Sequence, residues 1–234
     1  MTPEELHKYQ HIQSIAKETI EFLKSFIKEG LSAEEIKDAA EKFMNEKGVK
    51  SFWYYNIGAL VFVGAQTTIS ISGREYKASD LKVQSEDLVT VDLSPEIDGI
   101  WGDFARSFAV HDGKVVEVNQ SKLPEIVQGI KTEIELHEKL KKIINEETSF
   151  EEAYAEMNSL IEESGFENLD FNKNLGHSIV KHKDDRIYIK AGNKAKFKDV
   201  GLFTFEPHIK MKNGKYGFKH ENIYYFNQEK LQVL

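Results

Sequence analysis

The sequence predicts an α+β protein in which helices pack against antiparallel sheets. Two observations predict this class. Segments with apolar residues at helical spacing are followed by segments rich in β-branched and aromatic residues. This order also occurs twice, at an offset of 117 residues, which is half of the 234-residue chain. We therefore expect one domain, residues 1–234, built from two pseudo-symmetric halves of about residues 1–117 and 118–234.

The first half begins with two predicted helices. Apolar residues recur at helical spacing through residues 3–30. A second helix is predicted to begin at Ser32, which has the capping-box spacing to Glu35, and to end near Gly48. The next residues, 51–72, are aromatic and β-branched and predict strands.

The second half repeats the helix pair. When residues 24–50 are aligned with residues 141–167, eight of the 27 aligned residues are identical. The matches include a capping box and a closing glycine in each half: Ser32, Glu35 and Gly48, and Ser149, Glu152 and Gly165. Two amphipathic helices of similar composition could match by chance. An internal duplication is favoured because strands and a carboxylate-bearing hairpin follow both helix pairs.

Composition argues against several classes of function. Asp and Glu number 39 against 31 Lys and Arg, which gives a net charge of −8 without a basic stripe, so no nucleic-acid partner is expected. The absence of cysteine excludes disulfides, thiolate metal sites and a cysteine nucleophile. No apolar run approaches the length of a bilayer span, and the N-terminal residues lack a signal-peptide core, so we expect no membrane association and a cytoplasmic location.

Residues 89–110, VTVDLSPEIDGIWGDFARSFAV, predict a β-hairpin. The Asp-Gly pair at 98–99 signals a two-residue type I′ turn, so the numbers of opposed residues should sum to 197. Asp103 would then lie opposite Ser94, which shares a sheet face with Asp92. Asp92 and Asp103 become diagonal neighbours on that face.

Residues 203–226, FTFEPHIKMKNGKYGFKHENIYYF, predict a second hairpin. The Asn-Gly pair at 213–214 signals its turn, so opposed residues should sum to 427. Glu206 and Glu221 satisfy this sum and would face each other directly, with Cβ atoms about 5 Å apart.

Like charges placed in this way repel unless a proton or a cation lies between them. The alternative is that all four carboxylates are solvated on exposed sheet faces. Two facing pairs in corresponding positions of a duplicated chain favour a divalent metal site instead. Sites for Mn, Fe, Co or Zn often add an imidazole, and the segment NLGHSIVKH supplies His177, although a lone histidine on a strand is more often structural.

Five groups follow one another in a set order along the chain: Asp92, Asp103, Gly176-His177, Glu206-Pro207 and Glu221. This order resembles the metal-ligand signature of the methionine aminopeptidase and prolidase metallopeptidases. IKEGLSAEEIKDAAEKFMNEKG resembles the early helix pair of that family, DFARSF its Asp-x-x-Arg-Thr-Phe stretch, and GLFTFEPHI its Phe-Thr-Ile-Glu-Pro stretch. The resemblance covers nearly the whole chain and implies one catalytic pita-bread domain, with two pseudo-symmetric halves of helices packed on a curved antiparallel sheet.

The resemblance also implies an activity and a cofactor. The activity is that of an aminopeptidase or Xaa-Pro peptidase, a metallo-exopeptidase that hydrolyses the N-terminal bond of peptides or dipeptides through a water activated by two divalent ions of Mn, Co, Fe or Zn. Asp92 would bind one ion, His177 would complete the other, and Asp103 and Glu221 would bridge them. Glu206 would be both ligand and general base, so Glu206 and His177 are the implied catalytic residues. The family analogy also suggests a homodimer.

The sequence departs from the family at the substrate-binding histidines. Relatives usually carry one histidine before the first hairpin, where this chain reads TTISISGREYKASD, and a second about seven residues after the metal-binding histidine, where Asp184 stands. His182 and His208 are the candidate replacements. Alternatively, His182 is an exposed residue at a strand end and His208 lies at the rim of the site, and neither contacts substrate. Arg74 and Tyr76, in GREY, are further candidates for contact with substrate.

Two other functions stay open at this stage. The fold could serve as a peptide- or protein-binding module without peptidase activity, which the missing histidines favour and the complete ligand set disfavours. A metal-dependent amidohydrolase acting on a small non-peptide substrate is the other alternative. The sequence does not choose between Met, Xaa-Pro and other N-terminal specificities, or identify the metal.

Overall fold

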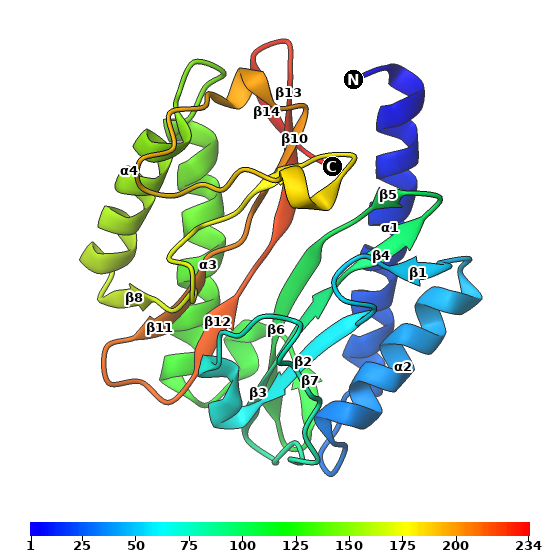
Figure 1. Ribbon diagram of the computed structural model, residues 1–234. Helices are drawn as coiled ribbons and strands as arrows, with labels where there is room; N and C mark the ends of the chain where they lie inside the picture. The colour runs from blue at the N-terminus through cyan, green and yellow to red at the C-terminus, as the bar shows by residue number, and fades with distance from the viewer.

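Each half of the chain consists of a helix pair packed on curved antiparallel sheets, and the two halves lie side by side (Figure 1). The structure is a computed structural model that describes all residues, 1–234. The helices are α1 (Pro3–Phe26), α2 (Ala33–Glu46), α3 (Pro124–Ile143) and α4 (Phe150–Glu163). The strands of the first half are β1 (Ser51–Phe52), β2 (Ala59–Val63), β3 (Asp87–Leu93), β4 (Pro95–Ile97), β5 (Ile100–Trp101), β6 (Phe104–His111) and β7 (Lys114–Val116). Those of the second half are β8 (Phe166–Asn168), β9 (Ser178–Ile179), β10 (Leu202–Phe205), β11 (His208–Met211), β12 (Gly217–Lys219), β13 (Asn222–Asn227) and β14 (Lys230–Val233).

The helix pairs confirm the pseudo-symmetric halves. Helices α2 and α4 have 14 residues each and begin 117 residues apart, and both open with the predicted capping box. Helices α1 and α3 end 117 residues apart. Gly48 and Gly165, which follow α2 and α4, have φ angles of +97° and +84°, a conformation in which glycine avoids the steric cost of a Cβ atom.

The first hairpin has the predicted register. Strands β3 and β6 pair from Asp87 opposite Val110 to Leu93 opposite Phe104, and β4 and β5 continue with Glu96 opposite Trp101, so every pair sums to 197. The turn residues at 98–99 have φ angles of +52° and +79°, as a type I′ turn requires.

The second hairpin has the predicted register but a different turn. Phe205 pairs with Asn222, and Lys210 pairs with Gly217, which preserves the sum of 427. The predicted two-residue turn at 213–214 is wrong, because six residues, 211–216, separate the last pair of this ladder, and the Gly214 N–H donates to the Met211 carbonyl at 2.7 Å. The register survives because the loop is extended by the same number of residues on each side.

Residues 51–72 contain less strand than predicted. Strands occupy only 51–52 and 59–63; residues 53–56 form a turn, and Gly64–Thr68 form a 3₁₀ helix. Tyr55 and Asn56 have positive φ angles, which a continuous strand does not allow. The aromatic residues here pack around a cavity instead of alternating across a sheet, so composition alone overstated the strand content.

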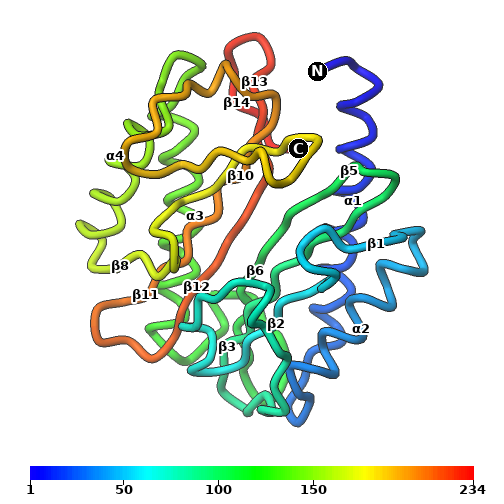
Figure 2. Tube along the Cα trace, in the orientation of Figure 1, coloured from blue at the N-terminus to red at the C-terminus, as the bar shows by residue number.

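The two halves join along the middle of the molecule, where β6 runs beside β12 and β13 (Figure 1). Ser107 Oγ accepts from the Lys219 N–H at 2.9 Å and donates to the Lys219 carbonyl at 3.0 Å. Glu221 N–H donates to the Ala105 carbonyl at 3.0 Å. Both chain ends lie towards the same end of the trace (Figure 2), and Lys17 in α1 donates to the Leu234 carbonyl. No helix combines the length and apolar character needed to cross a membrane.

Gly129 tests the contact between α3 and β12. A Cβ atom at Gly129 would lie 2.2 Å from the Phe218 ring, which is fully buried. Gly129→Ala gains about 1 kcal/mol of helix propensity, but overpacking a core commonly costs about 1–3 kcal/mol and this overlap is severe. We expect urea unfolding to show a net loss of about 1–2 kcal/mol.

Gly201→Ala is the matched control, because the nearest atom to its Cβ would be at an ordinary contact distance of 3.8 Å and its φ is unstrained. This variant should be as stable as the parent. Equal stability of both variants would contradict the close packing of α3 on β12.

Candidate metal centre

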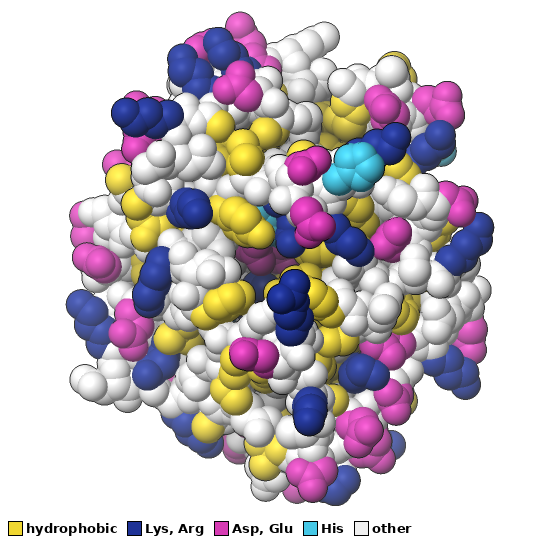
Figure 3. All heavy atoms as spheres, viewed as in Figure 1, with side chains coloured by type: hydrophobic (Ala, Val, Ile, Leu, Met, Phe, Trp, Pro, Cys, Tyr) yellow, Lys and Arg dark blue, Asp and Glu magenta, His cyan; other side chains and the backbone are white.

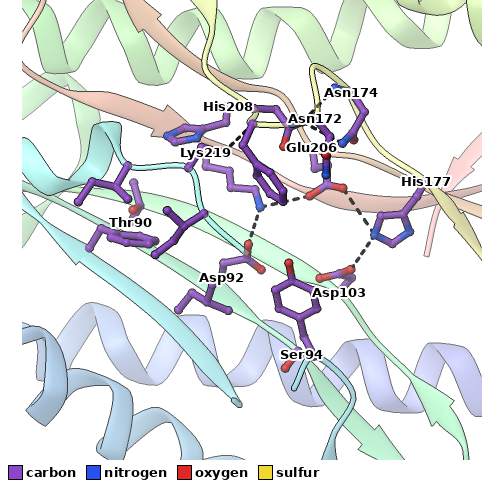
Figure 4. A pocket seen from close by; sticks show the side chains of 18 of the residues that line it. Thr90, Asp92, Ser94, Asp103, Asn172, Asn174, His177, Glu206, His208 and Lys219 are labelled. Carbon is purple, nitrogen blue, oxygen red and sulfur yellow. Dashed lines mark hydrogen bonds and ion pairs between the residues drawn. The ribbon is translucent and has the colours of Figure 1, made fainter. Parts of the chain in front are cut away.

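Both hairpins and the segment that carries His177 contribute to one cavity of about 130 Å³. Asp92, Asp103, His177 and Glu206 line this cavity, and their side chains point towards one another (Figure 4). The face of the molecule in Figure 3 is hollowed near its centre, where acidic side chains lie between apolar ones. Asp92 and Asp103 come from the first half and His177 and Glu206 from the second, so the cavity depends on the junction between the halves.

Asp103, His177 and Glu221 form a compact group. One ligand atom from each lies within 4.8 Å of the others, and all three residues are buried. His177 Nε2 lies 3.4 Å from Asp103 Oδ2 and 3.5 Å from Glu206 Oε1. These separations are close to those of atoms that share one cation at ligand distances of about 2.0–2.3 Å.

Glu221 shows that this group fits a cation. Its backbone is fixed, because the N–H donates to Ala105 and the carbonyl accepts from the Arg106 guanidinium at 2.6 Å. Its side chain is fully buried, yet neither carboxylate oxygen has a hydrogen-bond partner. Burial, together with the nearby charges of Asp103, Glu206 and Asp92, raises the pKa of Glu221 well above its usual range. A divalent cation between Glu221, Asp103 and His177 would satisfy these oxygens.

The buried Asp103 and the half-buried Glu206 respond differently to their surroundings. Burial raises the pKa of Asp103 to about 6, although its hydrogen bond with His177 opposes the rise. Burial would also raise the pKa of Glu206, but the charges of Lys219 and His177 outweigh this effect and lower its pKa. Glu206 is therefore the carboxylate best kept ionised in this cluster.

The His177 ring is held in a defined position. Gly176 precedes it with a φ of +147°, and a Cβ there would lie 2.2 Å from the Thr204 carbonyl oxygen, so only glycine allows this close approach to β10. The His177 N–H donates to Thr204 Oγ1 at 3.0 Å. Its Nδ1 lies 3.1 Å from the Ser178 carbonyl, and an Nδ1–H donated there leaves Nε2 with a free lone pair for a metal. The rings of Trp53 and Trp101 lie against the imidazole, with centroids 6.0 Å and 5.9 Å away.

Lys219 is the main site residue that the sequence analysis missed. Its ammonium group contacts Asp92 Oδ2 and lies 3.2 Å from Glu206 Oε2 (Figure 4). A signal for it was present, because Lys219 precedes Glu221 by two residues and strand alternation places both on one face. Arg186 also lines the cavity without having been predicted, and its guanidinium lies over the Trp53 ring.

The predicted substrate-binding residues are only partly brought to the cavity. His208 lines it, but its Nε2 donates to the Thr67 carbonyl at 2.7 Å, and burial lowers its pKa to about 4. The other three require correction. Tyr76 is buried with its hydroxyl on the backbone of Val61, because it caps the outer edge of β2. Arg74 stacks on Tyr55 in an exposed loop, and His182 is exposed at the start of a 3₁₀ turn; neither lines the cavity.

Comparisons with known proteins agree with the architecture. The model of metallopeptidase family M24 matches residues 7–228. Methionine aminopeptidase 1 of Bacillus subtilis (strain 168) is 29% identical over 140 residues, which cover 56% of this chain and 54% of that protein. The alignment thus spans about half the length of that relative.

Solved structures share the fold at low sequence identity. The X-Pro aminopeptidase of Thermotoga maritima MSB8 superimposes with a TM-score of 0.81 and 18% identity over all of this chain and 61% of its own. The methionine aminopeptidase of Rickettsia prowazekii gives a TM-score of 0.78 and 17% identity over all of this chain and 97% of its own. The predicted pita-bread fold is therefore confirmed.

The raised pKa of Asp103 predicts a pH-dependent stability for the metal-free chain. Its ordinary pKa is 3.8 and its folded-state pKa is about 6, so the folded protein holds this proton more tightly than the unfolded chain. The associated stabilisation is present at low pH and is lost as pH rises from about 4 to 6. In EDTA, Asp103→Asn should therefore unfold with a free energy higher than that of the parent at pH 7.5, by on the order of 2 kcal/mol, and similar to it at pH 4.

Added Mn²⁺ should make the parent more stable than Asp103→Asn at pH 7.5, because the parent gains stability from binding the ion and Asp103→Asn does not. Asp98→Asn, in the exposed turn, is the control and should match the parent under every condition. If Asp103→Asn follows the parent at both pH values and gains equally from Mn²⁺, Asp103 is neither strained by burial nor a ligand.

Proposed function

This chain belongs to metallopeptidase family M24, and we propose that it is a metal-dependent exopeptidase that removes the N-terminal residue from peptides or dipeptides. The observation that carries this proposal is Glu221, whose two buried oxygens lack partners and lie beside Asp103 and His177. A carboxylate in this state needs a cation or a proton, and the adjacent imidazole and second carboxylate complete a metal-binding donor set.

Asp103, His177, Glu206 and Glu221 would hold the cation. Mixed carboxylate and imidazole donors suit Mn, Fe, Co and Zn, so availability in the cell would select among them. When bound, a divalent ion at this position lowers the pKa of a coordinated water and polarises the scissile carbonyl. The fifth predicted ligand, Asp92, forms an ion pair with Lys219. Whether a second ion binds depends on whether Asp92 leaves that pair.

Glu206 has the properties of the general base. It lines the cavity, and the charge of Lys219 favours its ionised form. It would accept a proton from the attacking water and pass it to the amine that leaves. Thr204, two residues earlier on the same face, donates to Glu206 Oε1 at 3.4 Å and helps to fix its orientation.

The cavity wall supports a role in holding the side chain of an N-terminal residue. Four apolar side chains line the cavity: Leu60, Phe62, Ile69 and Ile71. Trp53, Tyr54 and Tyr188 add aromatic surface on the side of His177. Such a lining suits an apolar side chain and does not discriminate methionine from an Xaa-Pro substrate. A cytoplasmic location and a homodimer stay predictions of the sequence.

A peptide-binding module without hydrolysis is the second candidate. The observation that favours it is the state of His208, whose Nε2 is already bonded to Thr67 and is therefore not free to contact substrate. No histidine besides His177 and His208 lines the cavity. The module and the peptidase differ in turnover, which one assay can measure.

The proposal predicts separate effects for two variants assayed with Mn, Co or Zn on Met-, Ala- and Pro-containing dipeptides. Glu206→Gln should lower kcat by about 10²–10⁴-fold while metal binding remains measurable, because it removes the base. Asp103→Asn should lose metal and turnover together. Glu46→Gln, on the exposed end of α2, is the control and should behave as the parent.

The same assay separates the candidate functions. Metal binding without turnover of any peptide would support the module, and turnover of small amides but not of dipeptides would support the amidohydrolase. A parent protein that binds none of the three metals would overturn the exopeptidase.

A further inference from the structure

The cluster of four carboxylates is divided into two parts by the orientation of Glu206. Glu206 Oε1 faces His177, on the side where Asp103 and Glu221 lie. Its Oε2 faces the ammonium group of Lys219, which also contacts Asp92 (Figure 4). One part therefore presents an imidazole and free carboxylate oxygens, and the other already contains a positive charge.

Lys219 is held in this place by the junction between the halves. Its N–H and carbonyl both bond to Ser107 Oγ on β6, so its backbone cannot shift along the sheet. Its side chain is four-fifths buried and crosses from β12 to Asp92 on β3, in the other half of the chain. A buried lysine without a counter-charge is costly, so Asp92 and Glu206 stabilise it where it stands.

A cation bound to Asp92 Oδ2 and this ammonium group exclude each other. A divalent ion would lie about 2.0–2.6 Å from the Asp92 oxygens, and the Lys219 nitrogen already contacts Oδ2. The charges agree with this exclusion. One divalent ion and the ammonium leave the four carboxylates with one net negative charge. Two divalent ions would neutralise the carboxylates and leave the ammonium uncompensated in a cavity that Arg186 also lines.

We propose that this chain binds a single divalent cation, between Asp103, His177, Glu206 and Glu221, and that the Lys219 ammonium takes the place of a second cation beside Asp92. This inference rests on the proposed function, because it concerns the same metal. It replaces the sequence-based expectation of two ions. Lys219 is then a positioning residue that holds one oxygen of Glu206 and directs the other towards the metal.

The test is the number of Mn²⁺ ions bound per chain, measured by elemental analysis after equilibrium dialysis and by electron paramagnetic resonance. The parent at saturating Mn²⁺ should bind one ion and give the spectrum of isolated Mn²⁺. Lys219→Gln should bind two and give the spectrum of a spin-coupled pair, because Asp92 is released. Lys210→Gln, which removes a lysine paired with Glu167 on the neighbouring strand, should bind one.

Asp92→Asn keeps the test decisive if Lys219→Gln fails to fold. If Lys219 occupies the second position, Asp92→Asn should bind one ion with an affinity within about threefold of the parent, a difference below about 1 kcal/mol. Two ions in the parent would overturn the role of Lys219 and leave the proposed function standing. One ion in both the parent and Lys219→Gln would also overturn it. No ion in any of the proteins would instead overturn the proposed function itself.

Discussion

The burial of like charges at the junction between the halves is the constraint on which this structure depends. Asp103 and Glu221 are buried beside the half-buried Glu206, and burial together with the neighbouring negative charges raises the pKa of both Asp103 and Glu221. A fold that gathers such groups must also supply positive charge in fixed positions. Lys219 supplies this charge and is held by the contact of its backbone with Ser107, while the contact with Thr204 fixes the backbone of His177. The packing of β6 against β12 and β13 therefore also fixes the charged groups of the cavity.

The curvature of the sheets explains why the carboxylates meet. Three of the four carboxylates lie where a hairpin changes from one sheet to another, and Asp92 lies within β3. In the second half, β10 gives way to β11 around Glu206 and β12 gives way to β13 around Glu221. The same change occurs in the first half, where β5 ends before Asp103 and β6 begins after it. The side chains of Asp103 and Glu206 at these changes line the cavity. The duplicated hairpins therefore form the two walls of one cavity.

Much of this arrangement could be predicted from local signals. The Asp-Gly turn sets the register of the first hairpin, and strand alternation then places Asp92 and Asp103 on one side. What could not be predicted depends on distant contacts. Tyr76 was expected at the cavity, but its hydroxyl accepts a hydrogen bond from the Val61 N–H at the edge of β2. No local pattern in the sequence indicates this contact. Strand alternation places Lys219 on the face of Glu221, but its contact with Asp92 appears only when β3 and β12 are brought together. The segment after Phe52 was misjudged because aromatic residues pack around a cavity as readily as along a strand.

The donor set is divided between the halves, since Asp103 belongs to the first and His177 and Glu221 to the second. A bound ion would therefore act as a non-covalent cross-link between two parts of the chain that are joined in sequence only through the segment between β7 and α3. Ion binding and the docking of the two halves are then linked by one coupling free energy. Docking strengthens ion binding by the same free energy by which a bound ion strengthens docking. A substitution far from the cavity that loosens the contact of β6 with β12 would weaken ion binding without touching a ligand.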